Sequence, residues 1–169
     1  MSDAALIQQV LDESADHLRP WLTWMADEPL TLEQRQTLLA EQEGAWLAGG
    51  DVLLAVLVND AVAGGCEMHR LGDMQTLEIG YWIHPSFLHR GIATTVADLL
   101  TNAGFLVAGI EQVEIRHDKA NIASAVIAQR LGYEFVGETP GQPSAPAESG
   151  TQCAWRIARH DWLTRRPTG

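Results

Sequence analysis

Basic residues are scarce in this chain of 169 residues. It contains 11 Lys and Arg against 22 Asp and Glu, which gives a formal net charge of -11 with His neutral. Binding to nucleic acid depends on clustered Lys and Arg that neutralise phosphates, so this composition argues against a nucleic-acid partner. An acidic protein attracts cationic molecules and speeds their arrival, which favours amines as substrates.

Cysteines and long apolar runs are also scarce. Cys66 and Cys153 lie far apart without CxxC spacing, which argues against a disulfide framework and against a metal site. No apolar stretch approaches the roughly 20 residues that a membrane-spanning helix needs. The first sixteen residues are acidic and lack the basic start and apolar core of a signal peptide. We therefore expect a cytoplasmic protein without a membrane partner.

The order of predicted elements indicates a single domain over residues 1–169. Thr31 and Gln34 have the spacing of a capping box, and Asn59-Asp60 offers a tight turn between two strands. Hydrophobic periodicity and turn residues predict helices at 3–18, 31–49, 92–107 and 121–132, strands at 51–58, 61–71, 74–83, 112–117, 133–138 and 151–160, and a loop at 139–150. The first three strands form an antiparallel meander. This order predicts an α/β (α+β) fold in which helices flank a mixed, mostly antiparallel central sheet.

A loop of small residues follows the third predicted strand and opens a helix. Such a loop presents backbone N–H groups together with the positive end of the helix dipole, and this arrangement binds phosphate. Gly91 and Ala93 would let a ligand approach the backbone, Arg90 adds charge, and Thr94 and Thr95 offer hydroxyls. Neither GxxxxGK[ST] nor GxGxxG is present. Taken alone, the loop is weak evidence for a phosphate site, because a glycine near a helix start is common.

A second segment, about 30 residues later, carries a family resemblance. LHRGIA at 88–93 and NIASAVIAQRLGY at 121–133 together resemble the GCN5-related N-acetyltransferases (GNAT). In that family the acyl-CoA loop follows Q/R-x-x-G-x-G/A, and the next helix often reads N-x-x-S-x-x-V-x-x-R-L-G-F/Y. The EIGYWI strand at 78–83 and the LRPWL segment at 18–22 are similar to the RimJ/RimL branch, which modifies the N-termini of ribosomal proteins. The resemblance implies acetyl-CoA as donor and a homodimer.

Three positions depart from the family pattern. Leu88 stands where the family usually has Gln or Arg, which removes one pyrophosphate contact or moves it to Arg90 or His89. Many members carry a Tyr one helical turn after the position of Ser124, where this chain has Ala128. The family also begins with a strand before its first helix. Either such a strand precedes the given sequence, or the sheet has one strand fewer.

The resemblance implies a cleft between two diverging strands, the strand ending near Ile83 and the strand at 112–117. The pantetheine arm of acetyl-CoA would lie in this cleft and pair with backbone groups of Trp82 and Ile83. Asn121 and Ser124 would contact the arm. The phosphates would be held by the loop residues His89, Arg90, Gly91, Ile92, Ala93, Thr94 and Thr95.

The implied chemistry is direct attack of an amine on the thioester, without an enzyme nucleophile. Glu114 and Glu78 are the candidate bases, and either could instead be paired with a neighbour such as Arg116. His117 and His84 are weaker candidates, because a His near a strand end is usually solvated or capping. Ser124 is the hydroxyl placed to stabilise the leaving thiolate.

The sequence therefore predicts an acetyl-CoA-dependent N-acyltransferase without a metal. Its acceptor would be a protein N-terminal amine of the ribosomal type or a small amine. A succinyl-CoA-dependent transferase, a non-catalytic acyl-CoA-binding or sensing module, and an interaction domain without a CoA site are the alternatives at this point.

Overall fold

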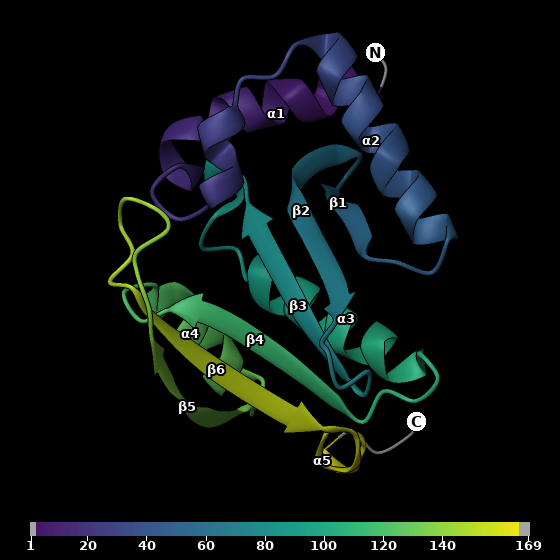
Figure 1. Ribbon diagram of the computed structural model, residues 1–169, viewed down its shortest axis with the longest axis vertical. Coiled ribbons are helices and arrows are strands. Elements are labelled where there is room, and N and C mark those ends of the chain that lie inside the picture. The colour runs from purple at the N-terminus through teal and green to yellow at the C-terminus, as the bar shows by residue number, and fades with distance from the viewer. Residues whose placement is uncertain (1–2, 166–169) are drawn as a thin grey trace.

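A computed structural model describes residues 3–165 as a six-stranded sheet with helices on both faces (Figure 1). The strand order is β1-β2-β3-β4-β6-β5. The strands are β1 (Val52–Val58), β2 (Ala61–Arg70), β3 (Thr76–Ile83), β4 (Gln112–Asp118), β5 (Glu134–Pro140) and β6 (Thr151–Ala158). The helices are α1 (Asp3–Leu18), α2 (Leu32–Leu47), α3 (Ile92–Leu106), α4 (Ile122–Arg130) and α5 (Arg159–Thr164), with 3-10 turns η1 (Thr23–Asp27) and η2 (Pro85–Phe87).

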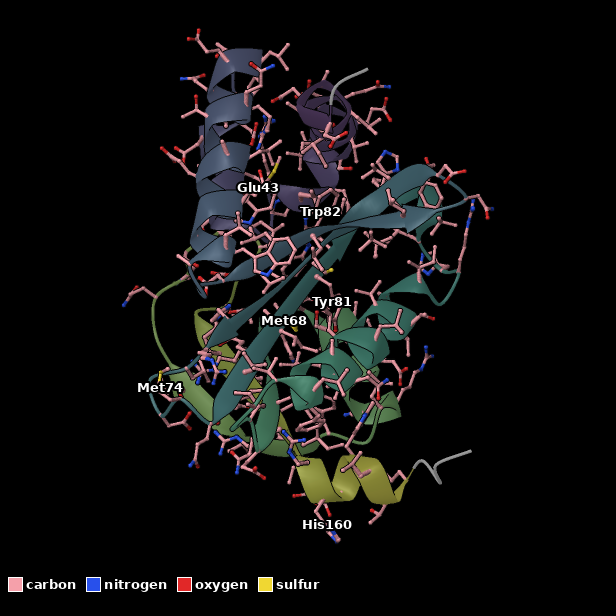
Figure 2. All side chains as sticks on the ribbon, turned by 90° about the vertical axis from the view of Figure 1, so that its right-hand side faces the viewer. Glu43, Met68, Met74, Tyr81, Trp82 and His160 are labelled. Carbon is pink, nitrogen blue, oxygen red and sulfur yellow. The ribbon has the colours of Figure 1, made fainter. Side chains whose placement is uncertain are left out.

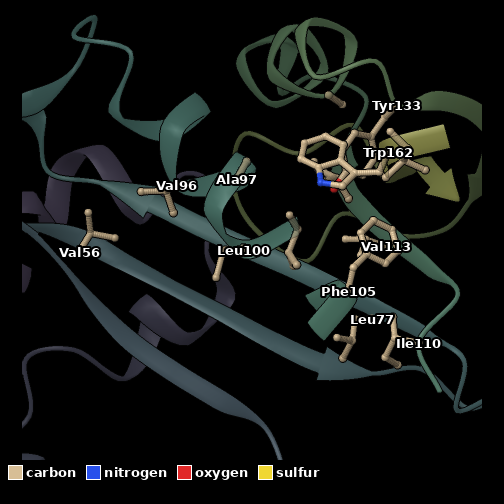
Figure 3. Close-up of a cluster of buried hydrophobic side chains, with 14 of the residues drawn as sticks. Val56, Leu77, Val96, Ala97, Leu100, Phe105, Ile110, Val113, Tyr133 and Trp162 are labelled. Atoms are coloured by element: carbon tan, nitrogen blue, oxygen red, sulfur yellow. The ribbon is translucent and has the colours of Figure 1, made fainter. Parts of the chain in front are cut away.

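The main core lies between the sheet and the helices α3, α4 and α5. Side chains alternate along each strand, so Leu77 and Ile79 of β3 point to the same face as Val113 of β4. They pack against Leu100 and Phe105 of α3, as Figure 3 shows for the labelled members of this cluster. A smaller cluster on the opposite face joins Trp82 to Leu11 and Leu18 of α1 and to Met25 of η1.

Strands β3 and β4 run parallel and pair over a short distance only. Thr76–Glu78 faces Gln112–Glu114, and beyond these residues the two strands diverge (Figure 1). On their other sides both strands stay paired, β3 with β2 as far as Ile83 and β4 with β6 as far as Asp118. The divergence therefore lies inside the sheet and leaves the facing edges of β3 and β4 without a strand partner.

Most predicted elements are confirmed. The Thr31–Gln34 capping box is present, and Asn59 and Asp60 adopt positive φ angles of 49° and 64° in the β1–β2 turn. The described sheet has six strands, and α1 is the first element of the described range. None of the helices in this range is long and apolar enough to cross a membrane.

The C-terminal prediction was wrong in its details. The last strand was expected to run to about residue 160, but it ends at Ala158 because Arg159 starts the short helix α5. The Arg159 guanidinium donates to the backbone oxygens of Phe105 and Ile110, which draws the chain toward the end of α3. Strand β5 also continues to Pro140, two residues into the predicted loop.

Candidate functional site

The start of α3 presents unpaired backbone N–H groups. Gly91 caps the helix with a φ of 78°, in the left-handed region that favours glycine, and no side chain caps it. Thr95 N–H donates to Gly91 O at 3.0 Å, so the N–H groups of Ile92, Ala93 and Thr94 have no partner one turn back. The first turn carries no acidic residue. Together with the helix dipole, these groups can hold an anion.

The remaining loop residues differ in what they can offer to a ligand. Arg90 is exposed, and its Cζ lies 5.2 Å from the centre of the Phe87 ring. His89 is exposed and also has a left-handed φ of 59°. The Thr95 hydroxyl already donates to Gly91 O at 3.3 Å. Leu88 is half-buried, so the side chain that departs from the family pattern serves packing.

The diverging edge of β3 carries backbone groups of Tyr81 and Ile83. His84 N–H donates to Ala63 O of β2, and the backbone groups of successive strand residues point to opposite edges. Ile83 and Tyr81 therefore face the divergence, whereas Trp82, the register partner of Gly65, faces β2. The backbone of Ile83 is therefore oriented toward the proposed cleft, whereas that of Trp82 is not. Tyr81 takes the place of Trp82 as the second residue whose backbone could pair with the arm of acetyl-CoA.

Helix α4 follows β4, the strand on the other side of the divergence. Asn121 caps it, because Asn121 Oδ1 accepts a hydrogen bond from Ser124 N–H at 3.2 Å. Ser124 lies in the first turn and is half-buried. The structure thus shows Asn121 as the cap of α4, and the contact of Asn121 and Ser124 with the arm of acetyl-CoA stays a prediction.

Tyr81 has a buried hydroxyl near Ser124, and sequence reasoning missed it. Within residues 3–165, the oxygen Tyr81 Oη is buried without a hydrogen-bond partner. Burial raises the pKa of Tyr81 far above its usual range, while an interaction with the Ser124 side chain lowers it. The alternation along β3 was the available signal, since it places Tyr81 on the same face as Ile79.

The two candidate carboxylates occupy different environments. Glu114 is fully buried, and both of its oxygens are bound: Oε1 accepts from Arg116 Nε at 2.5 Å, and Oε2 accepts from Arg156 Nε and Nη2 at 2.9 and 2.6 Å. A carboxylate held in this way is poorly placed to accept a further proton. Glu114 is therefore paired with arginines, which is the alternative to a general base that the sequence left open.

Glu78 is less tightly held than its register partner Glu114. Its Oε2 lies 3.5 Å from both Arg116 Nε and His69 Nε2, and its side chain is 19% exposed. Burial raises the pKa of Glu78, the neighbouring His69 and Arg116 lower it, and Glu114 raises it, with a net shift upward. A carboxylate with a raised pKa and one accessible side is suited to accept a proton.

The two candidate histidines have both ring nitrogens engaged. His117 Nδ1 lies 2.7 Å from Asp118 O, and His117 Nε2 accepts from Trp155 Nε1 at 2.9 Å. His84 Nδ1 accepts from Ser86 N–H at 3.1 Å, and His84 Nε2 lies 3.3 Å from Glu13 Oε2. Neither ring has a free nitrogen for catalysis, so these residues support the structure.

A groove of about 1110 Å³ lies on the opposite face of the sheet from α3, between α2, η1 and strands β1–β3. Figure 2 shows Trp82 on this side and Tyr81 below it in the same strand. Apolar side chains, including Trp24 and Trp82, share the lining with five carboxylates and one arginine. The carboxylates are those of Asp27, Glu28, Glu33, Glu41 and Glu67.

The one arginine of the groove is paired with Glu28, so the side chains that line the groove keep a negative net charge from the other four carboxylates. Arg35 is 4% exposed and binds Glu28 Oε1 and Gln8 Oε1. The groove could not be anticipated from the sequence, because it requires α2 to lie over the meander. In the described range, no cluster of three or more His, Cys, Asp or Glu side chains is placed to hold a metal ion.

Comparison with known proteins identifies the family of this chain. Residues 2–134 match the model of the acetyltransferase (GNAT) domain family. The "Putative ribosomal N-acetyltransferase YdaF" of Bacillus subtilis (strain 168) is 23% identical over 138 residues, which cover 80% of this chain and 75% of the relative.

Two solved structures share the fold. A "Probable acetyltransferase" superposes with a TM-score of 0.85 at 20% identity, covering 95% of this chain and 89% of that one. RimL, a ribosomal L7/L12 alpha-N-protein acetyltransferase in complex with coenzyme A, superposes with a TM-score of 0.81 at 16% identity, covering 92% and 88%. The family match over most of the chain is decisive: the chain belongs to the GNAT acetyltransferases, which transfer an acetyl group from acetyl-CoA to an amine.

Proposed function

We propose that this enzyme acetylates the primary amine of a cationic acceptor that enters through the acidic groove. The groove is the observation that carries the proposal, because its carboxylates attract an ammonium group and its aromatic walls accept an apolar neighbour. The first candidate acceptor is the N-terminal amine of a ribosomal protein, which the names of YdaF and RimL suggest. A small cationic amine is the second.

The donor side of the sheet fits acetyl-CoA, which supplies the acetyl thioester. The N–H groups at the start of α3 would hold its phosphates, with charge from Arg90 and with His89 beside it. The unpaired edge of β3 at Ile83 would pair with the amide groups of its arm. Asn121 and Ser124 would border the arm from α4.

Acidic residues lead from the groove toward the divergence of the strands. Glu67 lies opposite Gly80 in the β2–β3 register, where a Cβ on Gly80 would lie 2.6 Å from Glu67 Oε1. The next pair on the same face is His69 and Glu78. Glu67 is therefore the carboxylate that lies between the groove and Glu78 on this face of the sheet.

Glu78 is proposed as the general base. An α-ammonium group has a pKa of roughly 7.7–8.0, so it must lose a proton before its nitrogen can attack. The raised pKa of Glu78 improves the match to this task. Glu114 would then hold Arg116 and Arg156 in place beside it, as a positioning residue. Attack is direct, so no enzyme nucleophile takes part.

We infer further that the chain acts as one catalytic domain in the cytoplasm, where a ribosomal substrate would be met. The net charge of -11 supports the absence of a nucleic-acid partner. A homodimer is a prediction from the RimJ/RimL resemblance, and analytical ultracentrifugation checks it.

An acceptor panel read by mass spectrometry tests the proposed function. We expect acetylation of peptides with a free N-terminal amine and a nearby Lys or Arg, and none when the same N-terminus is blocked. Matched peptides with Glu in place of the basic residue should react more slowly, and added salt should narrow the difference. Succinyl-CoA serves as the second donor. Acetyl-CoA binding without turnover of any amine would favour a non-catalytic module instead.

A further inference from the structure

Tyr81 carries a buried hydroxyl without a hydrogen-bond partner of good geometry, although the Ser124 side chain lies near enough to lower its pKa. Tyr81 Oη and Ser14 Oγ are the buried side-chain oxygens without a hydrogen-bond partner in residues 3–165. Buried polar groups are normally paired, and an unpaired one costs stability, so each exception asks for an explanation. Ser14 lies on α1, away from the divergence of β3 and β4. Tyr81 lies on β3, three residues beyond the last pairing with β4.

Tyr81 lies on β3, and its hydroxyl lies near α4, which follows the other diverging strand. Its backbone faces the unpaired edge of β3, and its ring packs into the core beside α3. Its hydroxyl reaches the neighbourhood of Ser124 in the first turn of α4. The remaining residues of α4 carry no hydroxyl, thiol or acid. Tyr81 on β3 and Ser124 on α4 therefore bring two neighbouring hydroxyls to the divergence of β3 and β4.

The protonation state of Tyr81 suits a donor. Burial raises its pKa far above the usual range, so the phenol stays protonated at any working pH. Such a group cannot act as a base, but it can donate a hydrogen bond to developing negative charge.

We propose that Tyr81 is a further catalytic residue, whose hydroxyl, with that of Ser124, donates a hydrogen bond to the CoA sulfur as the carbon–sulfur bond breaks. This role rests on the proposed acetyl transfer. The amine nitrogen forms a bond to the acetyl carbon, and the electron pair of the broken bond goes to sulfur. The ammonium substrate gives up two protons: one leaves through Glu78 to water, and one ends on the sulfur. Tyr81 begins and ends protonated.

Tyr81→Phe is the direct variant, and Tyr133→Phe is its matched control. Tyr133 is also buried, but its hydroxyl has a hydrogen-bond partner, because it lies 2.6 Å from Thr101 Oγ1 of α3. Both changes remove one buried phenolic oxygen and keep the ring. We expect Tyr81→Phe to lower kcat about 100-fold with little change in the KM for acetyl-CoA. Tyr133→Phe should leave kcat near the wild-type value.

A binding experiment without turnover gives the decisive readout. The thiol of bound CoA is titrated by the ultraviolet absorption of its thiolate, with desulfo-CoA as the baseline. A hydrogen bond to the thiolate favours the charged form, so the pKa of the bound thiol should be about one to two units higher in Tyr81→Phe than in the wild type. Tyr133→Phe should match the wild type.

Other outcomes separate this inference from the function on which it rests. If the wild type binds CoA and Tyr81→Phe changes neither the thiol pKa nor kcat, the role of Tyr81 is overturned while acetyl transfer stands. If the wild type does not bind CoA, both proposals fail. Should Tyr81→Phe fail to fold, Ser124→Ala carries the titration: a raised thiol pKa supports the pair, and an unchanged one overturns it.

Discussion

The two faces of the central sheet offer opposite chemistry at the same pair of strands. Toward α3 and α4, β3 and β4 present apolar side chains, with the Tyr81 hydroxyl at the divergence. On the opposite face, Glu78, Glu114 and Arg116 form a charged cluster where the pairing of β3 and β4 ends. The period of two along a strand makes this possible, since neighbouring residues serve different substrates.

The comparison of the two faces also shows how an acidic protein can bind acetyl-CoA, whose phosphates are negatively charged. The donor face uses backbone N–H groups and Arg90 at the start of α3, which act locally on phosphates. The groove uses carboxylate side chains, whose field reaches farther and favours a cation. Each substrate would thus meet complementary charge on its own face, despite a net charge of -11.

The largest expected effect comes from Gly91→Glu, which damages the donor face alone. The variant places a side chain at φ 78° and a carboxylate among the N–H groups that would hold the phosphates. We expect complete loss of acetyl-CoA binding. Thermal denaturation checks this, because a ligand at about 100 times its Kd adds roughly 2.7 kcal/mol of stability to the wild type.

Gly109→Glu is the control for this variant. Gly109 has a φ of 80°, is exposed, and has open space around it, so the change carries the same strain and charge near the other end of α3. It should retain the full stabilisation by acetyl-CoA. Stabilisation of Gly91→Glu by acetyl-CoA to the wild-type extent would show that the phosphates bind elsewhere.

The next effect separates the two carboxylates of the groove face. Glu78→Gln removes the proposed base and should lower kcat by about 10²- to 10⁴-fold with the fold retained. Glu114→Gln leaves Arg116 and Arg156 without full compensation, and should cost about 1–3 kcal/mol of unfolding free energy. Steady-state kinetics and urea denaturation on both variants measure the contrast. A larger loss of kcat in Glu114→Gln than in Glu78→Gln would reverse the assignment.

Much of the fold was predictable because local patterns determine it. The capping box at Thr31 and the turn at Asn59 are short-range signals, and both are present. The short elements η1, η2 and α5 were missed, since helices of three to six residues show no clear periodicity. The β4-β6-β5 order was also beyond reach, because it places β6 between two strands that precede it in the chain.

In the candidate site, too, local features could be predicted from the sequence and long-range contacts could not. The loop around Gly91 was predictable because a left-handed helix cap is a local requirement. The contrast between the two carboxylates was not, because Arg156 reaches Glu114 through the β4–β6 register, 42 residues along the chain. Tyr81 was missed for the same reason: its nearness to Ser124 depends on how α4 packs against the sheet.

Acid should reveal the contribution of Asp118, a structural carboxylate at the end of β4. Burial by itself raises the pKa of Asp118, but hydrogen bonds from Ser149, Ala120 and Gly150 outweigh it and lower the pKa to about 2. The ordinary value is about 3.9. The carboxylate therefore stabilises the fold above about pH 4, and this contribution is lost as the pH falls from about 4 through 2.

Urea denaturation at pH 6 and pH 3 measures the contribution of Asp118. Between these conditions the wild type should lose more unfolding free energy than Asp118→Asn, because the variant has no carboxylate at this position to protonate. The hydrogen bonds to Ser149 and Gly150 tie the segment before β6 to the end of β4. Equal pH dependence in the two proteins would mean that these bonds contribute little.

The smallest effect tests whether the charge of the groove selects the acceptor. Glu41 and Glu43 are both exposed on α2, but Glu41 lines the groove and Glu43 does not. Removing a nearby charge weakens attraction of a cation by a modest amount at a surface, so Glu41→Gln should raise the KM for a cationic amine about two- to fivefold, with kcat unchanged. Glu43→Gln has the same change in net charge and should have no such effect at moderate salt. Equal KM values in the two variants would mean that the acceptor responds to the overall charge of the protein and not to this groove.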